Sequence, residues 1–154
     1  MEKKYELTDE IDILYRRPVR RIRALRDFGK VKAGDLGGFI ENEGNLSHEG
    51  DCWVGNDAKV NMNAKIFGNA QIFGEARITN EAYVYGNAMV FGNACVESSV
   101  HICENAQVYG IAEIYGDAKI CGYAHVCGDA VVSGKTCISD YEHISHNKKS
   151  QTYP

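Results

Sequence analysis

A six-residue alternation of small, polar and branched apolar residues runs from Cys52 to Ile144. Each unit begins with a small residue, usually alanine, and has valine or isoleucine two positions later, as in Ala64 and Ile66. Side chains alternate between the two faces of a strand, so residues i and i+2 point to the same side. The pattern therefore predicts short β-strands that bury their small and branched side chains together.

Glycine followed by asparagine or aspartate fills many of the remaining positions, as in Gly68-Asn69 and Gly116-Asp117. These residues tolerate positive φ, so we expect a corner after each strand. A helix is excluded, because a period of six with a turn pair in every unit does not fit 3.6 residues per turn. A chain that alternates strands and corners at constant pitch stacks along one axis. The sequence thus predicts a solenoid.

The hexads carry a family resemblance. The units Ile-Phe-Gly-Asn-Ala-Gln at 66–71 and Val-Phe-Gly-Asn-Ala-Cys at 90–95 resemble the hexapeptide-repeat superfamily of left-handed parallel β-helices. Tandem Gly-Asn-Ala-x-Val units are also similar to uncharacterised bacterial and phage members that are often labelled as acyltransferases from their fold. The resemblance implies an all-β, left-handed parallel β-helix of about five coils, each made of three hexads.

The chain divides into four segments. Residues 1–32 alternate apolar and polar positions in two stretches, 5–15 and 19–28, and predict a basic N-terminal β-hairpin that caps the helix. Residues 33–51 are rich in glycine, glutamate and asparagine and predict an irregular first coil or cap. Residues 52–146 are the hexapeptide-repeat β-helix. Residues 147–154 predict a flexible polar tail.

The composition fits one globular domain of 154 residues and excludes a disordered chain, because 44% of the residues are hydrophobic. No apolar run is long enough to span a membrane, and the first residues do not form a secretory signal. We therefore expect a cytoplasmic protein, in the host cytoplasm if it is phage-encoded, with its six cysteines as thiols.

The charge is unevenly distributed. The formal net charge is −4, but residues 1–32 hold ten Lys/Arg against six Asp/Glu, whereas residues 33–154 hold seven against fifteen. The basic residues of the leader include six arginines, namely Arg16, Arg17, Arg20, Arg21, Arg23 and Arg26. Two interpretations remain open. The arginines pair with acidic coils of a neighbouring copy, or their planar forks bind the oxygens of an anionic ligand such as a nucleotide.

Outward residues of a three-sided coil form three faces. The first face is polar and is interpreted as solvated surface: Lys59, Asn61, Arg77, Thr79, Cys95, Glu97, Glu113, Tyr115, Val131 and Ser133. The second face holds Lys65, Phe67, Tyr83, Tyr85, His101, Cys103, Lys119, Cys121, Cys137 and Ser139. The third face holds Trp53, Gln71, Phe73, Met89, Phe91, Gln107, Tyr109, His125, Cys127, His143 and Ser145.

Two of these faces expose columns of aromatic residues and therefore need a partner. The resemblance implies a homo-oligomer, commonly a trimer, packed through such faces. A subset of the rings, Tyr83, Tyr85, Phe91 and Tyr109, is also suited to stack on a ligand ring. A membrane partner is not expected, and nucleic acid is disfavoured because a duplex would meet an acidic solenoid.

The candidate catalytic residues are His101, His125 and His143, each at an outward position where a general base would lie. Acyltransferases of the superfamily add a protruding loop between coils to such a histidine, and these hexads contain no inserted loop. The zinc-binding relatives coordinate the metal with three histidines. The spacing of His101, His125 and His143 in this chain does not match the spacing of those ligands. An alternative metal set is His101, Cys103, Cys121 and Cys137, although flat ladders rarely bring four ligands into a tetrahedron.

These observations favour a non-catalytic oligomer, without a cofactor, that holds a small anionic ligand such as a nucleotide between subunits. A specific version is a phage protein that sequesters a host nucleotide immune signal. Two alternatives remain: a hexapeptide-repeat acyltransferase that uses acyl-CoA, and a purely structural or polymer-forming solenoid.

Overall fold

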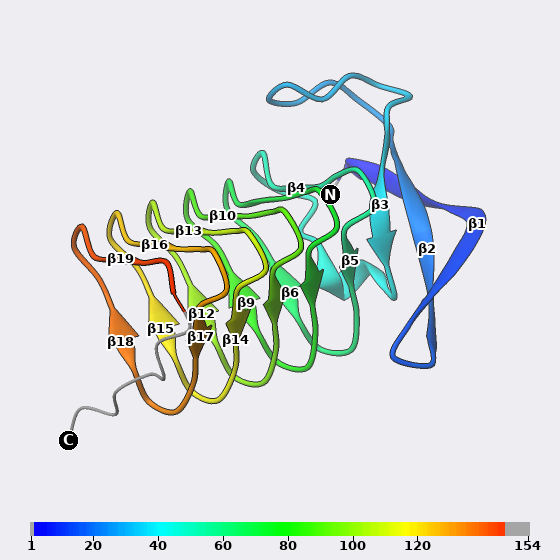
Figure 1. The fold of residues 1–154 in the computed structure, drawn as a ribbon. Coiled ribbons are helices and arrows are strands. Elements are labelled where there is room, and N and C mark those ends of the chain that lie inside the picture. The colour runs from blue at the N-terminus through cyan, green and yellow to red at the C-terminus, as the bar shows by residue number, and fades with distance from the viewer. Residues whose placement is uncertain (1, 147–154) are drawn as a thin grey trace.

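The structure is a computed structural model that describes residues 2–146. The chain begins with an antiparallel hairpin of β1 (Tyr5–Leu14) and β2 (Arg17–Ala24). Strand β2 also pairs antiparallel with β3 (Leu36–Ile40), and β3 then pairs in parallel with the coils (Figure 1). The hairpin thus extends one sheet of the solenoid beyond its first coil. The predicted tail, 147–154, lies outside the described residues.

The coils are built from strands of two residues each, separated by corners. A short 3-10 helix, η1 (Glu43–Asn45), lies in the first coil. The strands are β4 (Trp53–Val54), β5 (Lys59–Val60), β6 (Lys65–Ile66), β7 (Gln71–Ile72), β8 (Arg77–Ile78), β9 (Tyr83–Val84), β10 (Met89–Val90), β11 (Cys95–Val96), β12 (His101–Ile102), β13 (Gln107–Val108), β14 (Glu113–Ile114), β15 (Lys119–Ile120), β16 (His125–Val126), β17 (Val131–Val132), β18 (Cys137–Ile138) and β19 (His143–Ile144).

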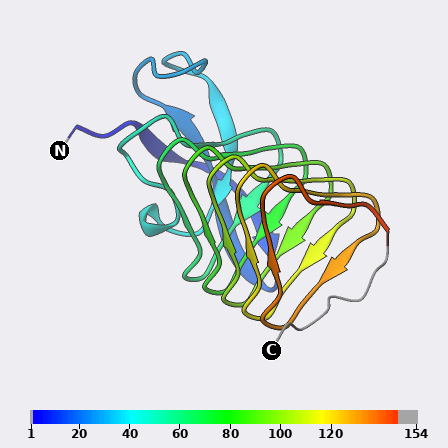
Figure 2. The same ribbon diagram turned by 90° about the vertical axis from the view of Figure 1, so that its left-hand side faces the viewer.

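Every third strand pairs in parallel and in register, so the strands form three sheets along one axis. The first sheet runs β1-β2-β3-β5-β8-β11-β14-β17, the second is formed by β6, β9, β12, β15 and β18, and the third by β4, β7, β10, β13, β16 and β19. Figure 2 shows the coils as nested loops of similar outline. The predicted parallel β-helix with an N-terminal hairpin is confirmed. It has about six coils, because the segment that contains β3 and η1 also folds as a coil.

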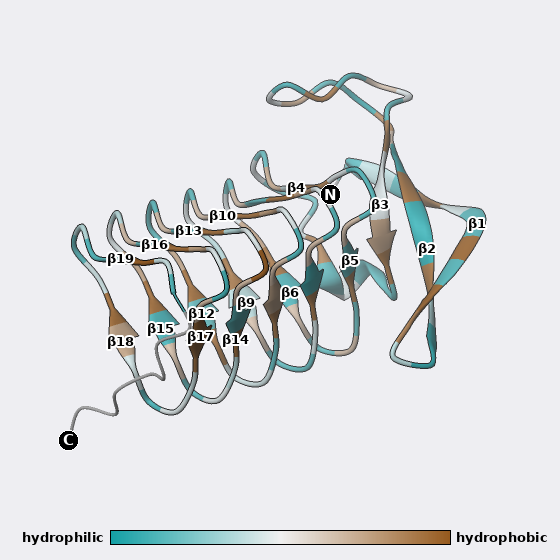
Figure 3. Ribbon diagram, viewed as in Figure 1, coloured by the Kyte–Doolittle hydropathy of each residue, from teal (hydrophilic) through white to brown (hydrophobic). Residues whose placement is uncertain are grey.

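The core is a continuous stack of the small and branched residues that define the repeat. Ala88 and Val90 are fully buried, and so are their equivalents in neighbouring coils. Hydrophobic residues recur at the same place in successive coils (Figure 3). Burying one valine or isoleucine side chain contributes about 1.5 to 3 kcal/mol, so the stack is the main source of stability.

The corners stack as closely as the strands do. Gly92 has a φ of +68°, and a Cβ placed there would lie 2.9 Å from the backbone nitrogen of Gly110 in the next coil. A side chain at Gly92 would therefore force the next coil to shift. The positive φ also favours glycine at this position of the repeat, although residues such as Asn80 and Glu104 adopt it at other corners.

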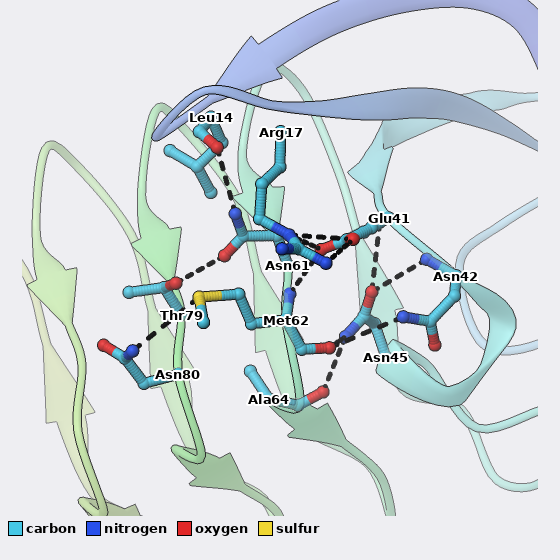
Figure 4. Close-up of polar contacts among 10 residues, drawn as sticks. All are labelled: Leu14, Arg17, Glu41, Asn42, Asn45, Asn61, Met62, Ala64, Thr79 and Asn80. Atoms are coloured by element: carbon cyan, nitrogen blue, oxygen red, sulfur yellow. Dashed lines mark hydrogen bonds and ion pairs between the residues drawn. The ribbon is translucent and has the colours of Figure 1, made fainter.

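The hairpin also packs against the first face, where the prediction of a solvated surface is wrong for Asn61 and Thr79 and holds for the remaining residues, which are exposed or half-buried. Asn61 and Thr79 are buried, since the side-chain amide of Asn61 donates to the carbonyl oxygen of Leu14 at 3.0 Å and accepts from the hydroxyl of Thr79 (Figure 4). Farther along the same face, the hydroxyl of Tyr15 lies 3.4 Å from the sulfur of Cys95. The hairpin tip covers these polar groups and satisfies them.

A second polar cluster ties the hairpin to the first coils. Arg17 forms a bidentate pair with Glu41, whose carboxylate also accepts from the backbone N–H of Met62 at 2.7 Å (Figure 4). The buried side chain of Asn45 donates to the carbonyl oxygens of Met62 and Ala64. These contacts link β2, η1 and the coil of β5 and β6. Among the described residues, no helix has the length and hydropathy needed to cross a membrane.

Candidate functional site

The second face carries one column in which cationic and aromatic side chains follow each other. The column contains Lys65, Tyr83, His101 and Lys119, which are paired in register on β6, β9, β12 and β15. Adjacent strands lie about 4.8 Å apart, so the four side chains span about 14 Å. Lys65 and Lys119 are exposed, and neither forms an ion pair with another described residue.

A shallow hollow lies over the N-terminal half of this column. Its volume is about 430 Å³, and it is lined by Asn63, Lys65, Glu81, Tyr83, Ser99 and His101. The ring of Tyr83 is half-buried and lies 5.1 Å from the ring of His101. The hollow therefore combines a cation, a ring surface and three small polar groups, with Glu81 as the opposing charge.

The neighbouring column of the second face is apolar at its start. Phe67 and Tyr85 stack with their ring centroids 4.8 Å apart and their planes 2° apart. The next two members of the column, Cys103 and Cys121, are both buried. This column borders the cationic column, and the ring of Phe67 lies 6.0 Å from the ring of Tyr83.

The third face presents a longer ladder of rings. Phe73, Phe91 and Tyr109 stack in parallel, with centroid separations of 4.7 Å and 4.9 Å. All three rings are half-buried within a single chain. Because each ring covers the flat side of the next, the ladder turns mostly ring edges toward solvent.

Each candidate histidine contacts the residue sixteen positions earlier. His101 lies 3.3 Å from the Tyr85 hydroxyl, and His125 lies 3.1 Å from the Tyr109 hydroxyl. His143 lies 3.2 Å from the sulfur of Cys127. These diagonal contacts between adjacent strands hold the imidazole rings against the two faces, and His101 also lines the hollow of the second face.

The alternative metal set is not assembled. Among residues 2–146, no three histidine, cysteine, aspartate or glutamate side chains gather closely enough to hold a metal ion. Cys103 and Cys121 are buried, whereas Cys137 is exposed. Burial and the neighbouring Cys137 raise the pKa of the Cys121 thiol to about 11. Cys121 is therefore a neutral thiol at physiological pH and a weak metal ligand.

The predicted arginines are largely engaged within their own chain. Five of the six lie 3.8 Å or less from a carboxylate of residues 2–57. The pairs are Arg17 with Glu41, Arg20 with Asp9, Arg21 with Glu10 and Asp57, Arg23 with Glu6, and Arg26 with Glu2. Arg16, which lies in the hairpin turn and is exposed, forms no such pair with another described residue.

Within one chain, the predicted ligand residues lie on three different sheets. The arginines belong to the hairpin of the first sheet, Tyr83 and Tyr85 to the second face, and Phe91 and Tyr109 to the third. Three of the arginine pairs, Arg20 with Asp9, Arg21 with Glu10 and Arg23 with Glu6, join β2 to β1, because the antiparallel register sets acidic residues of one strand beside basic residues of the other.

Two lysines were missing from the sequence-based set of ligand residues. Lys65 and Lys119 differ by 54 positions, which is three coils of 18 residues, so the period itself places them in one column with Tyr83. A third lysine, Lys4, has no such signal. It is fully buried, and its ammonium donates to the carbonyl oxygens of Gly50 and Cys52. Burial lowers the pKa of Lys4, and these acceptors and the ring of Phe28 compensate part of the loss of hydration.

The comparisons with known proteins agree with the fold. Residues 82–98 match the family model described as the YdcK beta solenoid repeat. The matched segment includes β9, β10 and β11, which is close to one coil. The chain is therefore similar to a β-solenoid repeat family. No curated protein matches it.

Proposed function

We propose that this protein is a non-catalytic, self-associating β-solenoid that binds a small anionic ligand, such as a nucleotide, on its second face at the boundary between copies. The observation that carries the proposal is the column of Lys65, Tyr83, His101 and Lys119. It combines positive charge for phosphate with a ring surface for a base on one flat, rigid sheet.

The ion pairing of the basic residues supports a ligand site on the second face rather than on the hairpin. A carboxylate of the same chain already neutralises most hairpin arginines, so a ligand would have to displace it. Lys65 and Lys119 require no such exchange. The hairpin arginines then fasten the cap, and Arg16 is the member of that set that stays open to a ligand or to a neighbouring copy.

The third face supports self-association. The ladder of Phe73, Phe91 and Tyr109 exposes apolar ring edges in one straight row, and apolar rows of this kind are covered in stable assemblies. The second and third sheets adjoin along a corner of the coil, because β9 is followed directly by β10. Copies that pack through the third face therefore bring a neighbour to the side of the second face that carries Phe67 and Tyr85, the column next to the cationic column.

A narrower form of the proposal concerns biological role. Binding without chemistry, together with the resemblance to phage members of the repeat superfamily, supports a protein that removes a host nucleotide signal by holding it. The candidate histidines support binding over acyl transfer, because each lies in hydrogen-bond contact with a tyrosine or a cysteine of the neighbouring column.

The test is a thermal-shift screen of the purified protein against cyclic nucleotides, ADP-ribose derivatives and acyl-CoA, followed by calorimetry on each hit. A ligand that binds the native state raises the melting temperature by mass action. We expect stoichiometric nucleotide binding, with affinity at least tenfold lower in the Lys65→Ala/Lys119→Ala variant. Lys135→Ala, which removes one exposed lysine from a corner, is the control and should bind like the unmodified protein.

The outcome also separates the alternatives. The ligand recovered after denaturation should be chemically unchanged, and recovery of an acylated or hydrolysed product would replace this proposal with an enzyme. A chain that binds none of the probes and forms larger assemblies as its concentration rises would be a structural solenoid. Light scattering across the same concentrations distinguishes that result from a closed oligomer.

A further inference from the structure

The ring ladder of the third face has an open end. Phe91 is covered on both flat sides, by Phe73 and by Tyr109. Phe73 is covered on one flat side alone, because the residue beside it in the preceding coil is Gly55, whose backbone N–H donates to Ile72. Among residues 2–146, no ring other than Phe91 stacks on Phe73. The ladder therefore begins at Phe73 and has no ring at Gly55 in the preceding coil.

The backbone at Gly55 does not require glycine. Its φ lies outside the left-handed region, and a Cβ placed there would meet the nearest atoms at 3.6 to 3.9 Å, which is ordinary van der Waals contact. The corner glycines differ in this respect, since neighbouring backbone leaves no space for a side chain at Gly92. The fold therefore does not impose the missing side chain at this rung, where the nearest side chains would be those of Trp53 and Phe73.

A hollow of about 380 Å³ lies at this end of the ladder, within the range of about 300 to 1,000 Å³ typical of small-molecule pockets. Phe73 and Met89 supply its apolar floor. The loop from Gly29 to Val31 forms one wall, where Phe28 covers the ring of Trp53 at a centroid distance of 5.2 Å. The remaining lining residues are Asp51, Asn69 and Gln71.

The polar groups at the rim suit a neutral ligand with hydrogen-bonding edges. Lys30 and Asp51 both line the hollow, so their charges oppose each other. The side-chain amide of Gln71 donates to the carbonyl oxygens of Asp51 and Asn69, at 2.8 Å and 3.2 Å, which orients its own carbonyl oxygen as an acceptor. A mostly apolar hollow with balanced charge and a fixed acceptor differs from the cationic column of the second face.

We propose that this open end of the ladder, lined by Phe73, Met89 and the loop 29–31, is a stacking site for a planar heteroaromatic ring such as a nucleobase or nucleoside. The bound ring takes the rung that Gly55 leaves vacant, covers the free side of Phe73 and contacts Met89. Stacking of a base on an aromatic side chain stabilises such complexes with little dependence on sequence. The site is independent of the anion site proposed on the second face, because it needs no phosphate.

The probe is adenosine, which has a planar ring and no charge. Calorimetry and ¹³C-methyl methionine NMR follow its binding to the full chain. The chain has three methionines, so the methyl signal of Met89 can be assigned by substitution. We expect adenosine to shift the Met89 signal by ring current and to leave the Met62 signal in place.

The decisive variant is Gly55→Phe, which places a phenylalanine ring against the free side of Phe73 and so competes with the bound ring. It should keep the fold and lower the affinity for adenosine at least tenfold. Ser145→Phe adds the same ring at the opposite end of the same column and serves as the control, with unchanged binding. If Gly55→Phe fails to fold, Phe73→Leu removes the stacking surface instead and should lower the affinity similarly.

Two results would overturn the site: the absence of any adenosine binding at millimolar concentration, or unchanged binding by Gly55→Phe or by Phe73→Leu. The Lys65→Ala/Lys119→Ala variant should bind adenosine normally. A loss of nucleotide binding in that variant with adenosine binding intact would separate the two proposals. Loss of adenosine binding in that variant would instead place the ring on the second face and contradict this inference.

Discussion

The hairpin end and the regular coils use charge in opposite ways. Every ion pair among residues 2–146 joins two residues of the segment 2–59, which includes the hairpin, the first coil and the start of the next. The coils beyond carry exposed cations such as Lys65, Arg77 and Lys119 that form none. The basic N-terminal segment therefore has most of its charges paired within the chain, whereas the acidic solenoid carries lysines and an arginine without an ion pair among the described residues.

The difference teaches that net charge along a sequence does not locate a binding surface. Antiparallel pairing places Glu6 beside Arg23 in register, so the hairpin neutralises itself. Parallel in-register stacking instead aligns equivalent positions of successive coils, and in the column of Lys65 and Lys119 those positions carry unlike residue types. A lysine in a coil thus meets a tyrosine or histidine, and its charge remains available to a ligand.

The largest expected difference in stability between the coils and the hairpin end comes from substitution of glycines with positive φ. Gly92→Ala places a Cβ against the next coil, which cannot retreat because another coil lies behind it. We expect a loss of about 3 kcal/mol in the free energy of unfolding, measured by urea denaturation. Gly34→Ala, at the hairpin end with φ +93° and no atom within 4 Å, should lose about 1 kcal/mol. Equal losses of unfolding free energy in the two variants would show that the coils adjust to an added side chain as readily as the loop at Gly34 does.

An intermediate effect concerns the buried contact between the hairpin and the first face. Asn61→Ala leaves the buried carbonyl oxygen of Leu14 without its donor, which should cost about 2 kcal/mol. Hydrogen exchange should accelerate in β1 and β2 more than in β11 to β16, because the contact holds the hairpin tip. Asn63→Ala, at an exposed corner, is the control. Uniform acceleration throughout the solenoid would mean that the hairpin and the coils unfold as one unit.

The smallest effect depends on pH. The hydrogen bond from Arg17 lowers the pKa of Glu41 below its usual value. A lowered carboxyl pKa contributes stability above the unfolded pKa and loses it as the pH falls through the folded pKa. Glu41→Gln should therefore cost about 1 kcal/mol or less at pH 7, since Arg17 is half exposed, and a smaller amount at about pH 3, because protonation of Glu41 weakens the same pair. Glu75→Gln, at an exposed corner, should show no such difference in thermal melts at the two pH values. A cost that persists undiminished in acid would assign the effect to packing.

The fold could be predicted from the sequence because each six-residue repeat contains all the residues that form its strand and its corner. Each hexad contains its own inward pair, such as Ala88 and Val90, and its own corner, so one unit specifies the next. The hairpin strands were predicted from alternation as well, to within a few residues. The segment 33–51 lacks the hexad pattern, and the parallel pairing of β3 with β5 emerged only from the structure.

The candidate site was predicted in part. The period placed Tyr83 and Tyr85 on one face and Phe91 and Tyr109 on another, which the structure shows. It did not predict that Asn61 and Thr79 lie beneath the hairpin tip, because that contact joins residues 47 positions apart in two different kinds of structure. Nor did it predict that the arginines are paired, which depends on the register of β1 against β2.

The sequence alone therefore determined the solenoid, the order of its faces and the columns along them, because in-register stacking at a constant period is a local rule. The tertiary structure decided which polar groups are buried, which charges are neutralised, and where a ladder of rings stops short at Gly55. Those properties depend on contacts between the hairpin, the loop 29–31 and the coils, and such contacts follow from packing in three dimensions rather than from any period in the chain.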